Sequence, residues 1–145
     1  IAVRDTQVLR RLYPTTDRRF LRLKVSDESG VIGWLVVIDT PMTDHKQFGT
    51  LRVGSIVDAL ATPENADRLV GAATSFLTKR GVDLIVSNQS HRDWCSGFQT
   101  AGYLSGPSNY LFATSRAFTR RIDAANVPSD GYYVNRGDGD GPINL

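Results

Sequence analysis

Hydrophobic and polar positions predict a β-α-β-α unit in the middle of the chain, over residues 51–103. Residues 51–60 form an apolar run of strand length, whereas residues 62–80 place apolar side chains at helical spacing. Residues 82–87 are almost continuously apolar, which is typical of a strand covered on both faces. Residues 91–102 return to helical spacing. This order predicts two parallel strands joined by a helix in one sheet.

The first long helix has start and end signals. Thr62 can cap it, and Pro63 suits its first turn, where the missing N–H costs nothing. Glu64 and Asp67 favour the positive end of the helix dipole, and Gly81 provides the stop. The apolar face comprises Ala66, Leu69, Val70, Ala73, Phe76 and Leu77.

The residues before this unit predict a helix and a hairpin. Apolar side chains recur at helical spacing in residues 1–13, and Pro14 ends that segment. Residues 20–25 and 31–38 are strand-like, and a polar turn with Gly30 joins them. Together with the strand that opens the central unit, they predict an antiparallel meander of three strands.

Residues 116–145 are basic and irregular, with an edge-strand candidate at 132–134 and a Gly/Asp-rich tail. A short strand is also expected at 111–113. The cluster Arg116, Arg120 and Arg121 is either a solvated segment or a contact for a phosphorylated ligand. The tail sequence RGDGDG is expected to be exposed, because the distal glutamate of a calcium loop is absent.

Length and charge narrow the function classes. The 145 residues suit one domain, and 41% hydrophobic residues argue against disorder. The net charge of +2 is too small to indicate a nucleic-acid partner. No apolar run approaches the roughly 18 residues of a membrane span, and the single cysteine, Cys95, fits a reducing compartment. We therefore expect a cytoplasmic protein with neither a nucleic-acid nor a membrane partner.

The order of elements resembles the later three-quarters of the GNAT (acyl-CoA N-acyltransferase) fold, an α/β (α+β) domain with a mixed, mostly antiparallel sheet and helices on both faces. LRVGSIVDAL at 51–60 looks like the long fourth strand of that fold, and residues 82–88 look like the fifth. WCSGFQTAGY at 94–103 is similar to the helix that ends in a Gly-aromatic pair. VRDTQVLRRLY at 3–13 and the closing RGDGDG resemble a bacterial GNAT-like subgroup, some of it linked to polysaccharide synthesis.

The resemblance implies transfer of an acetyl or acyl group from acetyl-CoA or another acyl-CoA, without a metal, to an amine of a small or sugar-linked molecule. The acyl-pantetheine arm would pair with backbone where the fourth and fifth strands part. The residues implied in cofactor binding are Ile56, Val57, Ala59, Leu60, Asn65 and Asn88.

Three departures from the family pattern are visible. The family's first strand and helix have no counterpart, so we expect them upstream of Ile1, or a homodimer or another domain covering that sheet edge. The family's glycine-rich phosphate loop is replaced at 62–67 by TPENAD, which has no glycine and two carboxylates. The family's tyrosine acid corresponds to Phe98, which has no hydroxyl.

Asp58 and His91 are the candidate catalytic residues. Asp58 lies in the central strand and is either a base that faces the substrate or a carboxylate bonded to neighbouring backbone. His91, like His45, is a general-base candidate because imidazole titrates near neutral pH, although a loop histidine is often idle. Cys95 falls among helical apolar positions and is expected to be a buried thiol. Two functions stay open: an acyltransferase, and a non-catalytic GNAT-fold binding or assembly module.

Overall fold

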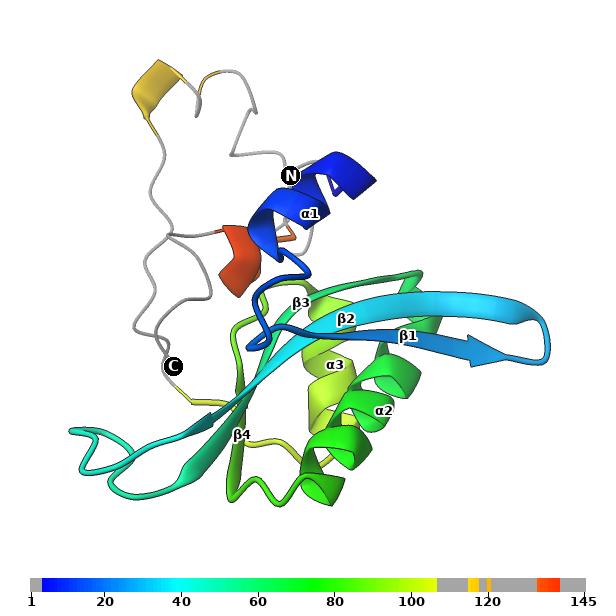
Figure 1. Ribbon diagram of the computed structural model, residues 1–145. Coiled ribbons are helices and arrows are strands. Elements are labelled where there is room, and N and C mark those ends of the chain that lie inside the picture. Colours follow the sequence, from blue (N-terminus) through cyan, green and yellow to red (C-terminus); the bar gives the residue numbers. More distant parts are fainter. Residues whose placement is uncertain (1–3, 107–114, 118–119, 121–132, 139–145) are drawn as a thin grey trace.

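A four-stranded sheet in the order β1-β2-β3-β4 forms the centre of the computed structural model, which describes residues 4–106, 115–117, 120 and 133–138 (Figure 1). β1 (Leu21–Asp27), β2 (Gly30–Pro41) and β3 (Arg52–Ala61) form the antiparallel meander, and β4 (Leu84–Ser87) runs parallel to β3. The mixed α+β architecture expected from the sequence is confirmed. Expected features at 111–113, at Arg121, at Tyr132 and from Gly139 onward lie outside the described residues.

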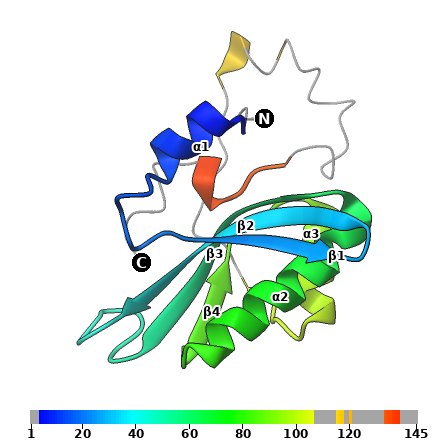
Figure 2. The same cartoon turned by 45° about the vertical axis from the view of Figure 1, so that its right-hand side comes forward.

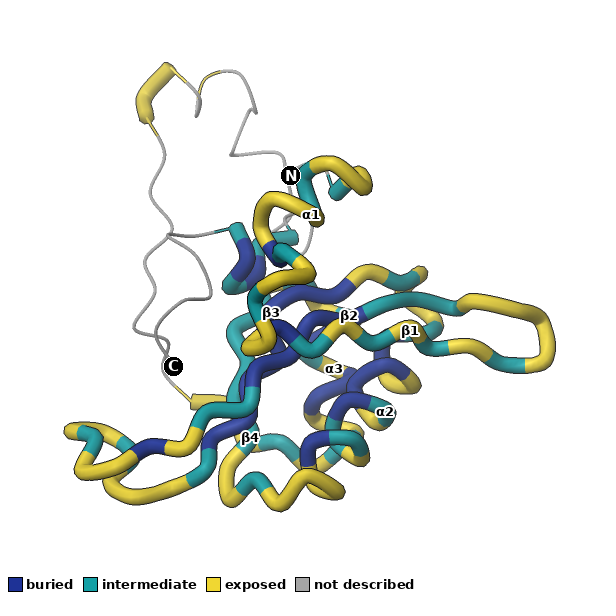
Figure 3. Tube along the Cα trace, viewed as in Figure 1, coloured by how far each residue is buried: buried dark blue, intermediate teal, exposed yellow. Residues whose placement is uncertain are grey.

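Helices cover both faces of the sheet. α2 (Ala66–Lys79) and α3 (Arg92–Thr100) lie on one side, whereas α1 (Thr6–Leu12) and the 3₁₀ turn η3 (Arg136–Asp138) lie on the other (Figure 2). The larger core joins sheet side chains to α2 and α3, for example Leu35 with Leu69 and Trp94. A smaller core on the opposite face comprises Tyr13, Phe20, Val36, Ile38 and Val57. Burial is therefore concentrated in the two layers on either side of β2 and β3 (Figure 3).

The helix over residues 62–80 differs from the expectation at its start. A 3₁₀ turn, η1 (Pro63–Asn65), precedes α2. The Thr62 side chain does not cap it; the Thr62 hydroxyl accepts a hydrogen bond from Asn65 Nδ2 at 2.9 Å instead. The predicted stop is confirmed, because Gly81 adopts φ +75°, which glycine reaches without strain.

The other boundaries are close to the prediction. α1 begins only at Thr6, because the Asp5 side chain accepts from the Val8 N–H at 2.8 Å and caps the helix there. β2 continues to Pro41, three residues beyond the expected strand. No helix in the described part of the chain is long and apolar enough to span a membrane.

Candidate functional site

Pairing between β3 and β4 ends halfway along β3, because β4 ends at Ser87. Their parallel pairing covers only four positions and ends at Ile56 and Ser87, whereas β3 continues to Ala61. A β-bulge lies at the same place: Val36 pairs with Asp58 and Val37 with Ile56, so Val57 is the extra residue. A bulge bends its strand and re-aims nearby groups. We call the region beyond the last β3–β4 pair, alongside residues 57–61, the strand gap.

The strand gap is occupied by the chain's own segment 133–138. The Tyr133 hydroxyl donates a hydrogen bond to the Ala59 carbonyl of β3. On the other side of the gap, the Ser90 N–H donates to the Val134 carbonyl at 3.0 Å, and the Val134 N–H donates to Ser90 Oγ at 2.8 Å. Burial raises the pKa of Tyr133 to about 12, so its hydroxyl remains protonated and can donate at neutral pH.

Asp58 is completely buried beside the bulge, and both of its oxygens accept hydrogen bonds. Arg4 Nε lies 2.8 Å from Oδ1 and 3.0 Å from Oδ2, and the Tyr13 hydroxyl donates to Oδ2 at 2.9 Å. Asn135 Nδ2 and the Ala59 N–H donate to Oδ1 at 2.6 and 2.9 Å. Of the two roles considered for Asp58, this geometry matches the hydrogen-bonded carboxylate; a role as base stays a prediction.

Arg4 joins the two ends of the described chain. Its Nη2 donates to Asn135 Oδ1 at 3.0 Å and to Asp138 Oδ2 at 2.9 Å, and its guanidinium lies 5.5 Å from the centre of the Tyr133 ring. Burial alone would lower the pKa of Arg4, but the hydrogen bond to Asp138 and the charge of Asp58 raise it. Arg4 therefore remains a cation. We call Arg4, Tyr13, Asp58, Asn135 and Asp138 the Asp58 cluster.

The expectation that the RGDGDG tail is exposed is wrong for its first three residues. Arg136–Asp138 form η3, and Gly137 is buried against the Asp58 cluster. A Cβ at position 137 would lie 2.2 Å from Tyr13 Oη and 3.0 Å from Asp58 Oδ2. Glycine is needed here because the backbone itself packs against the carboxylate.

His91 lies beside the strand gap, and its ring centre is 6.2 Å from that of Tyr133. It is the N-cap residue of α3: Nδ1 accepts from the Asp93 N–H at 3.3 Å, which leaves Nε2 as the other ring nitrogen. His45 instead holds the turn at the end of the β2–β3 hairpin, where its Nδ1 accepts from the Gln47 and Phe48 N–H groups. The structure thus brings His91, and not His45, to the gap.

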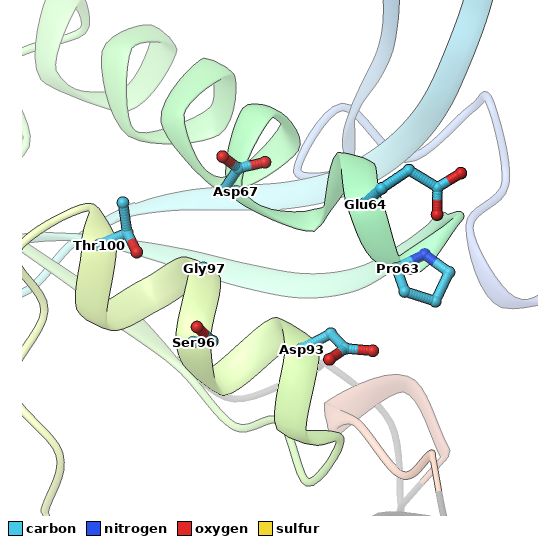
Figure 4. Close-up of a pocket in the computed structure, with 7 residues that line it drawn as sticks. All are labelled: Pro63, Glu64, Asp67, Asp93, Ser96, Gly97 and Thr100. Atoms are coloured by element: carbon cyan, nitrogen blue, oxygen red, sulfur yellow. The ribbon is translucent and has the colours of Figure 1, made fainter.

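An acidic pocket lies between α3, along its length, and η1 with the first turn of α2. Its cavity is about 220 Å³ and is lined by Pro63, Glu64, Asp67, Asp93, Ser96, Gly97 and Thr100 (Figure 4). A Cβ at Gly97 would be only 3.0 Å from the Asp67 backbone nitrogen, so this glycine lets the two helices approach closely. The N–H of Glu64 and the Thr62 hydroxyl lower the pKa of Glu64, which is therefore charged at neutral pH.

The remaining predicted site residues divide by position. Ile56 and Val57 are fully buried in the two cores, whereas Leu60 is 45% exposed on β3. Asn65 Oδ1 accepts from Arg68 at 3.1 Å, so it stabilises the first turn of α2. Asn88 follows β4 directly at the edge of the gap. Cys95 is half-buried, and burial raises the pKa of its thiol, which does not favour a nucleophile.

The sequence did not identify the partners of Asp58. An unpaired carboxylate inside an apolar strand is costly to bury, so Asp58 alone indicated that a cation must lie nearby. Asp58 could not indicate which of the chain's arginines pairs with it, because Arg4 is 54 residues away in sequence. Likewise, Asn135 and Asp138 reach the site only through the tertiary fold.

The fold of this chain is similar to that of solved structures of other proteins. Over 74% of this chain, an acetyltransferase of the GNAT family from Staphylococcus aureus superposes with a TM-score of 0.52 at 16% identity, over 73% of its own chain. A ribosomal-protein-alanine N-acetyltransferase from Brucella melitensis superposes with a TM-score of 0.54 at 15% identity, over 74% of this chain and 79% of its own. A transcriptional regulator from Bacillus halodurans superposes with a TM-score of 0.54 at 14% identity, over 74% of this chain and 73% of its own.

This chain has the GNAT fold. No protein-family model matches the sequence, and no curated protein matches it. The resemblance drawn from the sequence implies that β3 and β4 are counterparts of the family's fourth and fifth strands, and that the strand gap is the counterpart of the place where those strands part. Likeness at this level of identity establishes the architecture, and the chemistry must be argued from the residues at the gap.

The residues fit the two ends of an acyl-CoA differently. Beside the gap, β3 continues without a β4 partner from Val57 to Ala61, which suits an extended thioester arm that pairs with backbone. At the position of the phosphate loop, Glu64, Asp67 and Asp93 surround the acidic pocket and would repel a pyrophosphate. The site is therefore suited to the arm of such a donor and poorly suited to its nucleotide.

Proposed function

We propose that this chain is an acyltransferase-like domain that transfers an acyl group from a thioester donor to an amine of a small or sugar-linked molecule. The observation that carries the proposal is the coincidence of the Val57 bulge with the end of β3–β4 pairing at Ile56 and Ser87. Bulges are frequent next to active sites because they re-aim backbone groups. Here the second half of β3 extends beyond the end of β4, and an extended arm would pair with its backbone there.

His91 is the proton acceptor in this proposal. Its ring lies beside Tyr133 at the gap, and its Nδ1 is engaged by the helix cap, which fixes the orientation of the ring. Nε2 would take the proton that the amine loses on acylation and would return it to the leaving thiolate. This needs the tautomer that carries its proton on Nδ1, which lies 3.6 Å from Asp93 Oδ2, in place of the bond that Nδ1 accepts from the Asp93 N–H. Asp58 would act indirectly: bonded to Arg4, Tyr13 and Asn135, it would hold β3 in the bulged conformation.

The donor is expected to be recognised mainly through its pantetheine arm. The carboxylates of Glu64, Asp67 and Asp93 oppose binding of the pyrophosphate, so acetyl-CoA should bind no more tightly than S-acetylpantetheine, which lacks the nucleotide. This ranking is unusual for a CoA-dependent enzyme. It would indicate a donor whose thioester is attached to something other than the CoA nucleotide.

A second function has its own support. The chain is alternatively a non-catalytic binding or assembly module, because the gap holds Tyr133 and the Asp58 carboxylate is fully hydrogen-bonded. Both features stabilise the domain without any ligand. The two functions make opposite predictions about thioester binding.

Thermal unfolding with ligand separates them. A ligand that binds only the folded state adds about 2.7 kcal/mol of stability at a hundredfold excess over its Kd. We expect the melting temperature to rise with millimolar S-acetylpantetheine, and to rise no more with acetyl-CoA. Pantetheine without the acyl group and CoA alone are the controls. Unchanged melting temperatures with both acyl ligands would reject the acyltransferase and favour the module.

A further inference from the structure

We infer that segment 133–138 is an autoinhibitory occupant of the strand gap, with Tyr133 as the group that an incoming thioester arm must displace. The inference rests on the proposed function, since it concerns what controls access to the same gap. Tyr133 bonds the Ala59 carbonyl, which is one of the backbone groups that an extended arm would pair with. The segment and the arm therefore compete for the same hydrogen-bonding group.

The contacts of the segment divide into two sets. Asn135, Gly137 and Asp138 are fixed to the Asp58 cluster: Asn135 is 5% exposed and donates to Asp58, and Asp138 is paired with Arg4. Tyr133 and Val134 contact β3 and Ser90 through the Tyr133–Ala59 bond and the two bonds between Val134 and Ser90. The Tyr133 hydroxyl also accepts from Asn135 Nδ2 at 3.1 Å, and its ring centre lies 6.4 Å from that of Trp94. The segment is thus anchored at 135–138, whereas its bonds to Ala59 and Ser90 are ones that a ligand can replace.

The anchor makes displacement local. When Tyr133 swings out, its bonds to Ala59 and Asn135 and the two Val134–Ser90 bonds break, whereas Asn135 stays bonded to Asp58 and Asp138 to Arg4. A ligand that forms hydrogen bonds with the same groups offsets this loss. The Tyr133 ring also contacts His91, with their centres 6.2 Å apart, so its departure would uncover the imidazole that we propose as proton acceptor.

Two substitutions weaken the gap contacts while leaving the bonds of Asn135 to Asp58 and of Asp138 to Arg4 in place. Tyr133→Phe keeps the ring and removes the hydroxyl bonded to Ala59 and Asn135, and Ser90→Ala removes the acceptor for the Val134 N–H. Tyr103→Phe is the matched control, because its hydroxyl, 2.9 Å from Thr74 Oγ1, belongs to the contact between Tyr103 and α2. We expect Tyr133→Phe to bind S-acetylpantetheine about fivefold more tightly than the parent chain, Ser90→Ala to gain less, and Tyr103→Phe to gain nothing.

Hydrogen–deuterium exchange gives the second readout. Autoinhibition predicts that S-acetylpantetheine accelerates exchange of the Ser90 and Val134 amides, because the ligand displaces their partners, while the Asn135 amide stays protected by Asp138. Equal affinities for the parent chain and Tyr133→Phe, or slower exchange of Ser90 and Val134 on ligand binding, would overturn the inference while leaving the proposed function standing.

Failure of the proposed function has a different signature. If S-acetylpantetheine binds, displaces Tyr133 and binds more tightly to Tyr133→Phe, yet no amine is acylated, the gap is a regulated binding site and acyl transfer is rejected. If neither the parent chain nor Tyr133→Phe binds S-acetylpantetheine, the autoinhibitory role is overturned, because there is then no arm to exclude.

Discussion

Arg4 Nε lies 2.8 Å from Asp58 Oδ1, and this contact joins the segment that precedes α1 to β3. Both side chains are almost fully buried, with exposed fractions of 5% and 0%. The pair therefore connects the start of the described chain to the bulge beside the strand gap. Loss of either charge would leave the other buried without its main partner.

Arg4→Met tests this connection. Breaking a buried pair by removing one partner typically costs 3–5 kcal/mol, so we expect the free energy of unfolding in urea to fall by about 3 kcal/mol. Adding Asp58→Asn should recover part of the loss, because it removes the uncompensated charge. Arg19→Met is the control: its pair with Asp17 is exposed, and its removal should change stability little. Equal losses for Arg4→Met and Arg19→Met would contradict the role given to Arg4.

Gly137→Ala should destabilise the domain by about 1–3 kcal/mol, measured by urea unfolding. The new Cβ would lie 2.2 Å from Tyr13 Oη, so Tyr13 or η3 must move away from Asp58. Gly71→Ala is a matched control in α2, where a Cβ meets nothing within 4 Å. There, alanine should stabilise the helix by up to about 1 kcal/mol. A neutral Gly137→Ala would show that η3 does not pack tightly on the cluster.

Asp39 gives a pH-dependent prediction. Hydrogen bonds from Arg52, reinforced by Arg80, hold the pKa of Asp39 below its usual range. A carboxylate with a depressed folded-state pKa stabilises the fold above its unfolded pKa of about 3.9, and this contribution is lost as the pH falls through the folded value. The melting temperature of the parent chain should therefore be higher than that of Asp39→Asn at pH 7, and this difference in melting temperature should be smaller at pH 2.5. A difference that is the same at both values would exclude this ion pair as its cause.

His91→Asn separates catalysis from capping. Asparagine is a good N-cap residue, so α3 should keep its start, whereas the imidazole is lost. If His91 accepts the proton, kcat for acyl transfer should fall by about 10²–10⁴-fold with little change in the affinity for S-acetylpantetheine. His45→Asn, in the distant hairpin turn, should leave kcat unchanged. A parallel fall in affinity would instead indicate that His91 only supports the gap.

Local pattern was sufficient to predict most of the fold. The alternation in β1 and the amphipathic face of α2 each result from burial on a defined side of the sheet. The expectation that β4 is covered on both faces is wrong, because Leu84 is 37% exposed and no residue of β4 is fully buried. The start of α2 was less predictable, because Pro63 and Asn65 form a separate 3₁₀ turn whose contacts are local but do not follow the usual capping pattern.

The candidate site was only partly predictable. Asp58 and His91 were identified because a carboxylate in a strand and a histidine at a helix start are locally conspicuous. Their surroundings were not, since Tyr133 and Asn135 approach the gap from a segment more than 70 residues after β3. The same separation in sequence explains why the local pattern predicts an exposed tail for the RGD turn. Its buried position depends on Tyr13 and Asp58, which no local pattern reveals.

The acidic pocket gives the last prediction, which concerns the choice of donor. Neutralising Glu64 and Asp67 as Glu64→Gln/Asp67→Asn removes two charges near the expected pyrophosphate position. Charges a few ångströms apart at a wetted surface interact by somewhat less than 1 kcal/mol, so acetyl-CoA should bind about fivefold more tightly at low salt. The gain should shrink at 1 M salt, where the Debye length is only about 3 Å. Binding of S-acetylpantetheine should not change, and Glu28→Gln, in the exposed β1–β2 turn, should affect neither ligand. An equal gain for both ligands would show that the carboxylates act on the arm or on the fold, and that the pyrophosphate does not lie in this pocket.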